Sequence, residues 1–592
     1  MKEPKKWGFV VVCIAFTFLG LYANLFGSPS QLQLFNHSFI RELKSMMLVL
    51  INSRDETPQY STKSPHHPMS NIIAPNLSSC HESLTDANRR VYCCPPYSPD
   101  EPIVDFQFPD PSTTPLRIRR PAHKLTPEFI QKYANGIKAM QSLPLSDPRN
   151  FLRQAALHCI FCTGSYDQID GTDRRRPPGI IKIHRSWLFM PWHRMLFYFH
   201  ERIVGELIGD PTFGLPYWNW DTPDGMVIPD MYMRPPFADS ERDVTHLPPA
   251  TANDNYDYDE SHSEEELIQS NLALLYHQMV SGARKPELFH GCSYRAGPDG
   301  ACDGAGTIEL APHNPIHTWV GSSLQPERED LGAFYTAGKD PLFYAHHSNV
   351  DRMWELWQRA RGYEPEITDP DWLDSYFFFY DEKLQLTRIK IRDVLQISKL
   401  RYTYEEADLP WLNAKPKPSI PPKIAKNMLK MREINEVRNG SMGRLRSATH
   451  LSMHFGSEGR ILHEMVRIKV KRPRVCRTEK EKAEEEEVLV VYGIKVLKDK
   501  YAKFDVFVNA VNETGLGPQA REFAGTFVNG RMGARRPMVN EIVKKTVLKV
   551  GITELLEDLE ADCDEFIWVS LVPRCHMGDY ISFQGVTIDF MR

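Results

Sequence analysis

The sequence has no large excess of charge of either sign. Its 592 residues include 71 lysines and arginines and 76 aspartates and glutamates, for a formal net charge of -5. Because so small a net charge creates no strong attractive field, nucleic acid is not expected as a partner. Apolar residues are plentiful, by contrast: 42% of the chain is hydrophobic and 11% is aromatic, so the chain can bury a large core.

The N terminus lacks the Ser- and Arg-rich, amphipathic pattern of a plastid transit peptide. Instead, a lysine-bearing segment, residues 1–7, precedes an apolar run over residues 8–27. A membrane-spanning helix needs roughly 20 apolar residues and a signal peptide needs fewer, so the run fits either. We therefore predict a signal peptide or a membrane anchor over residues 1–27. The compartment predicted is the secretory pathway: the ER lumen, the vacuole or the cell exterior.

The cysteines agree with an oxidising compartment. Cys80, Cys93, Cys94 and Cys159 lie beyond the apolar run, and the sequence alone leaves their pairing open. A further pair flanks a glycine-rich loop and is a candidate bridge, Cys292 with Cys302. Four Asn-x-Ser/Thr sequons are glycosylation sites or chance matches: Asn36, Asn76, Asn439 and Asn512.

Composition divides the rest of the chain. Residues 28–79 are polar and aperiodic, which predicts a stalk or linker. Apolar residues at helical spacing, for example over residues 192–208 and 350–357, predict a mainly α-helical domain over residues 80–412.

A second change of composition follows that domain. Residues 415–423 are so rich in proline that they cannot continue a helix or a central strand, so we predict an interdomain linker over residues 413–450. Beyond it, short stretches of β-branched alternation, such as residues 465–470 and 503–508, predict an antiparallel β-sandwich over residues 451–592.

Histidines gather in two places along the predicted helical domain. His158, His184 and His193 form the first cluster, and His193 follows Pro191 near the start of a predicted helix. The His-Glu-x-x-His motif of a zinc hydrolase is missing, because neither His-Glu pair of the chain has the second histidine.

The second cluster contains His313 and His317, four residues apart, which places both on one face of a helix. His346 and His347 follow on the next predicted helix. Two sets of three neutral imidazoles favour copper, with zinc as the alternative. Asp351, four residues after His347, either pairs with the arginine that follows it or orients His347 through the second ring nitrogen.

With these clusters, the chain resembles the plant polyphenol oxidases of the tyrosinase and catechol oxidase family from Cys80 to the C terminus. The resemblance implies a helical bundle around a dicopper site, followed by the antiparallel β-sandwich. It implies that the first copper ion is held by His158, His184 and His193. It implies that the second is held by His313, His317 and His347, with His346 behind these ligands.

The resemblance also assigns roles around the two metals. Cys162 would form a thioether bond with His184, where a free core thiol is the alternative. Glu309 and Asn314 would hold a water near the second copper ion, although Glu309 could be a simple helix N-terminal carboxylate. Phe334 and Thr318 would border the substrate entrance. The disulfides implied are Cys80 with Cys94 and Cys93 with Cys159.

The function implied is the oxidation of o-diphenols to o-quinones by dioxygen, with the hydroxylation of monophenols left open. The resemblance further implies a latent precursor, in which residues 451–592 shield the copper entrance until cleavage within residues 413–450. Three alternatives stay open. The first is a biosynthetic oxidase that acts on one specialised phenol, the second is a dioxygen-binding dicopper protein without turnover, and the third is a copper-free structural relative.

Overall fold

The computed structural model describes residues 72–85, 88–95, 101–169, 179–297, 300, 302–363, 367–438, 453–497, 500–513, 515–531, 533–535, 543–574 and 578–592. All of them belong to one compact unit, Met69–Arg592. The predicted targeting segment, most of the predicted stalk, and the sequons at Asn36 and Asn439 lie outside the described residues. Among the described residues, no helix combines the length and apolar content that a membrane crossing requires.

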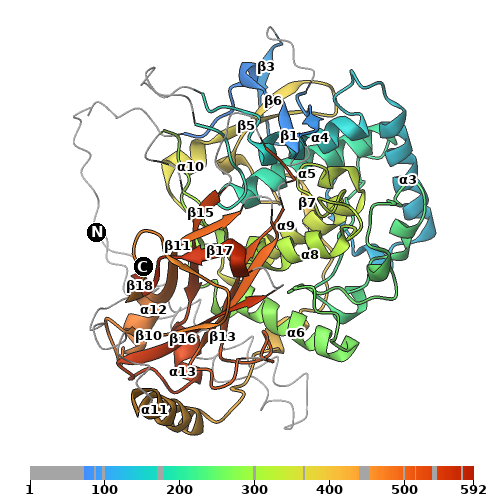
Figure 1. Ribbon diagram of the computed structural model, residues 1–592. Helices are drawn as coiled ribbons and strands as arrows, with labels where there is room; N and C mark the ends of the chain where they lie inside the picture. The colour runs from blue at the N-terminus through green and yellow to red at the C-terminus, as the bar shows by residue number, and fades with distance from the viewer. Residues whose placement is uncertain are drawn as a thin grey trace, which may run out of the picture. The chain divides into compact units, whose positions relative to one another are not determined.

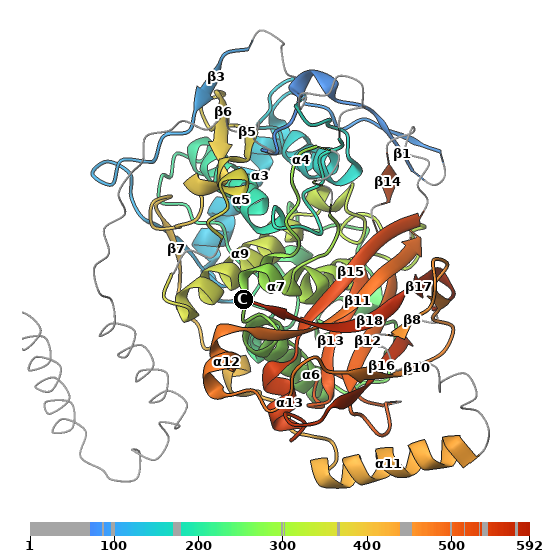
Figure 2. The same ribbon diagram turned by 90° about the vertical axis from the view of Figure 1, so that its left-hand side faces the viewer.

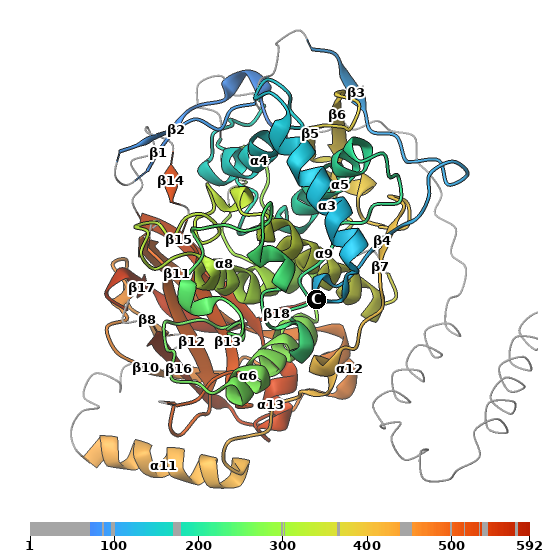
Figure 3. The ribbon, with the colours of Figure 1, turned by 90° about the vertical axis from the view of Figure 1, so that its right-hand side faces the viewer.

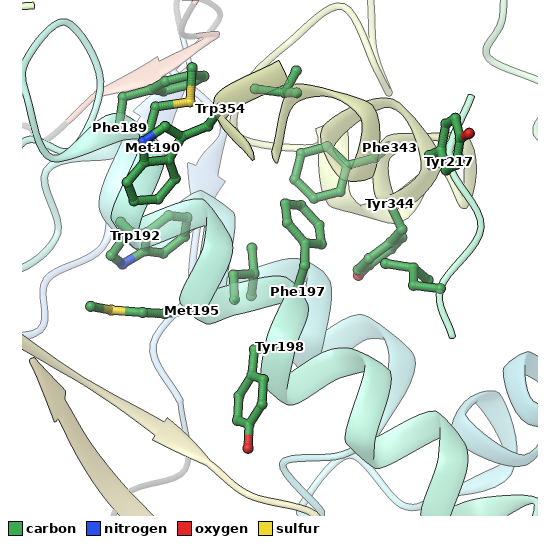
Figure 4. Packing of buried hydrophobic residues seen from close by; sticks show 14 of the residues in the cluster. Phe189, Met190, Trp192, Met195, Phe197, Tyr198, Tyr217, Phe343, Tyr344 and Trp354 are labelled. Atoms are coloured by element: carbon green, nitrogen blue, oxygen red, sulfur yellow. The ribbon is translucent and has the colours of Figure 1, made fainter. Parts of the chain in front are cut away.

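Two long buried helices form the centre of the helical part (Figure 1). They are α5 (Phe189–Leu207) and α9 (Leu342–Ala360), and they pack against each other. Figure 4 shows Phe197 of α5 directed toward Phe343 of α9, and their ring centroids are 5.6 Å apart. Both helices are buried on nearly all sides, which is typical of a helix in the middle of a domain.

Further helices surround this pair. They are α3 (Pro127–Ser142), α4 (Phe151–Thr163), α6 (Glu264–Tyr276), α7 (Pro286–His290), α8 (Asn314–Val320) and α10 (Pro370–Asp374). The ends of α4 are fixed by its sequence. The Asn150 side chain caps the first turn, and Gly164 ends the helix at φ 71°, a left-handed conformation that glycine adopts readily.

Short strands connect distant parts of the chain around the helices. β4 (Arg117–Arg119) runs parallel to β7 (Tyr402–Tyr404). β6 (Leu386–Lys390) pairs with β3 (Ile103–Asp105) and β5 (Tyr376–Tyr380). A third small sheet joins the N-terminal arm to a segment that follows β13 in the sequence. In it, β1 (Ser83–Thr85) pairs with β2 (Arg90–Val91) and with β14 (Ala534–Arg535).

The C-terminal part is an antiparallel β-sandwich, as predicted. One sheet has the order β10-β16-β12-β13, and the other has the order β8-β18-β11-β17-β9 with β15 also paired to β11. Strands of the two sheets share one hydrophobic core. The strands of the first sheet are β10 (Val466–Lys471), β16 (Phe566–Arg574), β12 (Ala502–Val508) and β13 (Phe523–Asn529). Those of the second are β8 (Met453–His454), β18 (Gly585–Met591), β11 (Glu486–Leu497), β17 (Ile581–Phe583), β9 (Arg460–Ile461) and β15 (Val543–Gly551).

Three short or peripheral helices accompany the sandwich: α11 (Pro422–Arg438), α12 (Glu479–Glu484) and α13 (Thr553–Asp558). α11 lies within the predicted linker and is seen at the edge of the sandwich in Figures 2 and 3. The proline-rich stretch does not prevent this helix, because Pro422 stands at its first position, where a missing backbone N–H costs nothing.

Four disulfides cross-link the described residues. The structure pairs Cys80 with Cys94 and Cys93 with Cys159, the pairs that the resemblance implied. It also pairs Cys292 with Cys302. A fourth bridge, between Cys476 and Cys563 of the sandwich, was not expected.

Candidate metal centre

Three histidines of the second cluster bring their Nε2 atoms together. The Nε2 atom of His317 lies 3.1 Å from that of His313 and 3.1 Å from that of His347, and the remaining pair is 3.3 Å apart. His313 ends the π-helical turn η8 (Glu309–His313), His317 lies in α8, and His347 lies in α9. These separations suit one ion bonded to each nitrogen at about 2.0–2.1 Å.

The other ring nitrogens explain why the Nε2 lone pairs face one another. Nδ1 of His317 donates to the backbone oxygen of Leu331 at 2.7 Å, and Nδ1 of His313 lies 3.0 Å from Oδ1 of Asn314. A ring that carries its proton on Nδ1 presents a bare lone pair at Nε2. Burial lowers the pKa of His317 to about 4, so this ring is neutral at ordinary pH. Neutral imidazoles are the form that binds a metal ion.

The first cluster is built in the same way. His158 lies in α4 and donates from Nδ1 to the Phe334 oxygen at 2.7 Å. His193 lies in α5 and donates from Nδ1 to the Phe189 oxygen at 2.8 Å. His184 stands in the segment before α5, with its ring centroid 5.2 Å from that of His193.

The two clusters adjoin. Potential ligand atoms of His158, His193 and His347 lie within 4.8 Å of one another, and so do those of His158, Cys162 and His184. The ring centroids of His193 and His347 are 4.4 Å apart. The six histidines predicted from the sequence therefore converge on one buried site, in two adjacent sets.

Cys162 belongs to the same site. Its Sγ lies 3.4 Å from Nδ1 of His184, and 3.5 and 3.4 Å from the two ring nitrogens of His158. Among the described cysteines it is the one outside a disulfide, and burial raises the pKa of its thiol. The sulfur is thus in contact with His184, and equally with a second predicted ligand.

Glu309 and Asn314 connect the second histidine cluster to neighbouring segments of the chain. Oε1 of Glu309 accepts a hydrogen bond from the backbone N–H of Arg185 at 2.7 Å, which ties η8 to the residue after His184. Asn314 contacts the His313 ring and also places Nδ2 3.5 Å from the backbone oxygen of Val528. Both side chains are buried.

Phe334 and Thr318 lie differently relative to the histidines. The Phe334 ring stacks on His184, with centroids 4.8 Å apart and planes 16° from parallel. The Thr318 hydroxyl instead donates to the backbone oxygen of Asn314 within α8, at 3.3 Å. Phe334 is therefore the aromatic wall of the site, whereas Thr318 directs its polar group to the helix backbone.

His346 packs behind the second cluster. Its ring stacks on that of His313, with centroids 5.5 Å apart and planes 16° from parallel. It is fully buried, and one of its nitrogens lies within 4.8 Å of potential ligand atoms of His313, His317 and His347.

Three segments of the chain match known domain families. Residues 148–360 match the common central domain of tyrosinase, residues 366–417 the polyphenol oxidase middle domain, and residues 459–590 the C-terminal domain of chloroplastic polyphenol oxidases. A chloroplastic polyphenol oxidase of Malus domestica is 41% identical over 526 residues, 88% of this chain and 84% of that protein. Aureusidin synthase of Antirrhinum majus is 41% identical over 528 residues, 88% of each chain.

The chain belongs to the plant polyphenol oxidase family. It is accordingly an oxidoreductase. The structure of latent apple tyrosinase superimposes on this polyphenol oxidase with a TM-score of 0.70 at 40% identity, covering 83% of this chain and 100% of the other. The helical part and the β-sandwich thus occur together in a solved relative.

The relatives correct the predicted compartment. Polyphenol oxidases of Malus domestica, Vitis vinifera and Vicia faba are named chloroplastic. The prediction of the secretory pathway for this polyphenol oxidase is therefore wrong, and the relatives point to a plastid. An apolar run after lysines indicates only that a segment can enter a membrane or a translocation channel. The compartment to which a protein is sent depends instead on the receptor that recognises its targeting segment.

The prediction for Asp351 is also wrong. Its carboxylate accepts hydrogen bonds from Arg194 Nε at 2.5 Å and Arg119 Nη1 at 3.1 Å. The hydroxyls of Tyr402 and Tyr404 donate to it at 2.7 and 2.6 Å. The carboxylate is fully engaged in this buried network and does not orient a metal ligand.

The two groups proposed as partners of Asp351 have other surroundings. Among the described residues, Nδ1 of His347 has no hydrogen-bond partner. Arg352 pairs with Asp221 instead, at 2.9 Å. Spacing along α9 suggested contacts of Asp351 with His347 and Arg352. In the structure, side chains from distant segments occupy the hydrogen-bonding positions of the Asp351 carboxylate instead.

The β-sandwich of this polyphenol oxidase contacts the site through the end of β13. The sequence did not single out this segment. Asn529 Oδ1 accepts a hydrogen bond from Arg185 Nη1 at 2.7 Å, and Phe334 N–H donates to the Arg531 oxygen at 3.2 Å. A Cβ atom added at Gly530 would lie 2.8 Å from Cζ of Phe334. Leu310 of η8 in turn packs in the hydrophobic core of the sandwich.

Proposed function

We propose that this polyphenol oxidase binds two copper ions and oxidises o-diphenols to o-quinones with dioxygen. His158, His184 and His193 would hold one ion, and His313, His317 and His347 the other. The observation that carries the proposal is the convergence of three Nε2 atoms within 3.1–3.3 Å. Bound copper would supply the electron transfer and the activation of dioxygen.

The protein's own residues would position the substrate and manage its proton. A phenol has a pKa of about 10, so a nearby group must take its proton if it is to bind a metal ion well. Glu309 and Asn314 would hold a water for this purpose, since both are buried and anchored beside the second cluster. The Phe334 ring, stacked on His184, would form the wall against which the substrate ring packs.

We also propose that Cys162 forms a thioether with His184. The 3.4 Å separation of Sγ and Nδ1 supports it, and the bond would fix the orientation of the His184 ring in the copper-loaded site. Its formation replaces one S–H and one ring C–H by a C–S bond, with dioxygen as the oxidant. Peptide mass spectrometry of the copper-loaded protein should show the two segments cross-linked, with two hydrogen atoms fewer than their sum.

We propose that residues 451–592 keep the enzyme latent. A polyphenol oxidase of Prunus armeniaca is named a latent form, and the relative described above is a latent tyrosinase. The contacts of Asn529 and Gly530 with Arg185 and Phe334 support a cover over the site. Cleavage within residues 413–450, followed by release of the sandwich, should raise catechol turnover, and unchanged turnover would exclude latency.

The decisive test is copper content measured together with catechol oxidation. We expect two copper ions in the unaltered chain and about one in His347→Leu, with loss of turnover, because a metal site loses one of its three ligands. His346→Leu is the matched control from the same helix, and it should keep both ions. Equal copper content in the two variants would refute the ligand assignment, and copper uptake without turnover would favour a dioxygen-binding protein.

A narrower biosynthetic role is the second candidate. Aureusidin synthase of Antirrhinum majus and (+)-larreatricin hydroxylase of Larrea tridentata are each 41% identical to the chain, as is the polyphenol oxidase of Malus domestica. Overall identity therefore does not separate the two roles. Turnover of a panel of monophenols, catechols and larger plant phenolics would do so, since a specialised oxidase should accept one class alone.

A further inference from the structure

A cavity of about 440 Å³ lies on the face of α4 that is turned away from the histidines. Leu152, Ala155, Ala156 and Cys159 line it, at the spacing of one helix face, whereas His158 belongs to the metal centre. The two alanines leave the space open because their side chains are short. The volume falls in the range of small-ligand pockets, about 300–1,000 Å³.

One part of the cavity wall is apolar and accessible. Tyr92, Leu145 and Leu152 line it and are 72%, 54% and 50% exposed. Single exposed apolar side chains are common, but several around one cavity form a surface that a ligand can cover. An aromatic ring suits this surface, because it can lie against both the tyrosine ring and the leucine side chains.

The rest of the wall is positively charged. Arg89, Arg90, Arg153 and Lys339 line the cavity, and no aspartate or glutamate of the described residues does. Arg89 and Arg90 each pair with a carboxylate that does not line the cavity, Glu329 at 2.9 Å and Glu82 at 3.6 Å.

The other two cations are less well neutralised. Lys339 Nζ is 3.8 Å from the nearest Asp330 oxygen, and its side chain is 49% exposed. Arg153 donates from Nε to the backbone oxygen of Leu145, and no carboxylate pairs with it within the described part of the chain. The cavity thus offers cationic hydrogen-bond donors beside an apolar surface.

We propose that this cavity binds small aromatic carboxylates. The carboxylate would pair with Arg153 and Lys339, and the ring would cover Leu145, Leu152 and Tyr92. A guanidinium group fits a carboxylate in both charge and geometry. The site is separate from the metal centre and does not depend on copper. Tyr335 also lines it, so a bound ligand would touch the residue next to Phe334.

Calorimetric titration of the full-length, copper-loaded protein with cinnamate tests the proposal. Cinnamate has no phenolic hydroxyl and is therefore no substrate, and cinnamamide is its neutral counterpart. We expect saturable binding of cinnamate, weakened about tenfold or more by Arg153→Glu, because a hydrogen-bonded ion pair is lost. Lys423→Glu is the matched charge reversal, on α11 and outside the cavity, and it should leave binding unchanged.

A second variant distinguishes binding in the cavity from a general effect of charge and from a folding defect. Ala156→Phe fills the cavity without changing its charge, so it should abolish cinnamate binding while catechol turnover persists. The proposal is overturned if cinnamate does not bind saturably, if cinnamamide binds equally well, or if the two charge reversals weaken binding equally. It is also overturned if binding survives Ala156→Phe, and competition with catechol would then place the ligand at the metal centre.

Discussion

Asp239 is a carboxylate that is protonated more readily in the folded protein than in an unfolded chain. Burial, reinforced by the Asp340 carboxylate, raises the pKa of Asp239 to about 7. An unfolded aspartate titrates at about 3.9. The stabilising contribution of the protonated form is therefore complete below about pH 4 and is lost as the pH rises through about 7.

Asp239→Asn should remove this pH dependence. The amide oxygen can still accept the hydrogen bond that Oδ1 receives from the Glu241 backbone, at 2.7 Å. We expect the melting temperature of the variant to equal that of the unaltered protein near pH 4 and to exceed it by about 2 °C near pH 8. Asp224→Asn, at an exposed aspartate, is the control. A constant difference between Asp239→Asn and the unaltered protein across this range would contradict the assignment.

The histidine clusters were visible in the sequence, but local spacing accounted only for the pair His313 and His317, and the sets of three ligands came from the family resemblance. His313 and His317 stand one helical turn apart, and His346 is distinguished from His347 by which of them reaches the Nε2 triangle. The partners of Asp351 were not predictable. Arg119 lies 232 positions away in the sequence, and only the packing of β4 beside α5 and α9 brings it to the carboxylate.

At the scale of elements, β4 is joined to α5 by a buried ion cluster. Arg117 Nε and Arg119 Nε donate to the two oxygens of Glu201 at 2.6 and 2.7 Å, and all three side chains are buried. Burial alone would raise the pKa of Glu201, but the two arginines lower it below its usual value. The carboxylate is therefore ionised in the folded protein, and its loss would leave two buried cations short of a partner.

Glu201→Gln should consequently destabilise the protein by about 3–5 kcal/mol, the usual result of breaking a buried ion pair on one side. Glu405→Gln is the matched control. Glu405 pairs with the next residue along from β4, Arg120, at 3.3 Å, but both side chains are exposed. Its loss should cost about 1 kcal/mol or less. Thermal unfolding of the two variants measures the difference. Similar losses of stability would show that the buried ion cluster stabilises the protein no more than the exposed ion pair does.

Strands with a clear β-branched or alternating pattern were easier to predict than strands without one, since β12 is buried at all seven positions and its residues 503–508 were still predicted. β10 alternates buried and half-buried residues, and the sequence predicted it. β13 is buried at all seven positions, because the sandwich core covers one face and the helical part the other, and it was missed. Its sequence, with a glycine and no alternation, resembles no isolated strand.

At the scale of the whole molecule, the proposed cover over the metal centre would depend on few polar contacts. Asn529→Ala would leave Arg185 without its hydrogen bond from the sandwich, and a lost hydrogen bond to a charged group costs about 1.5–3 kcal/mol. We expect catechol turnover of the uncleaved enzyme to rise by about tenfold, in keeping with that cost. Asn512→Ala, at an exposed asparagine of the same sandwich, should leave turnover unchanged, and equal rates in both variants would argue against the cover.

The small sheet that joins β1 to β14 has a consequence for maturation. β14 follows β13 and leaves the sandwich to pair with an arm that precedes the helical part, through Leu84 with Arg535 and Thr85 with Ala534 (Figures 2 and 3). A protease that cuts once near α11 would therefore yield two polypeptides that still elute together on a sizing column and separate on a denaturing gel. Proteolytic cleavage and activation would then be separate events. The delay between them would depend on how fast the paired strands β1 and β14 separate.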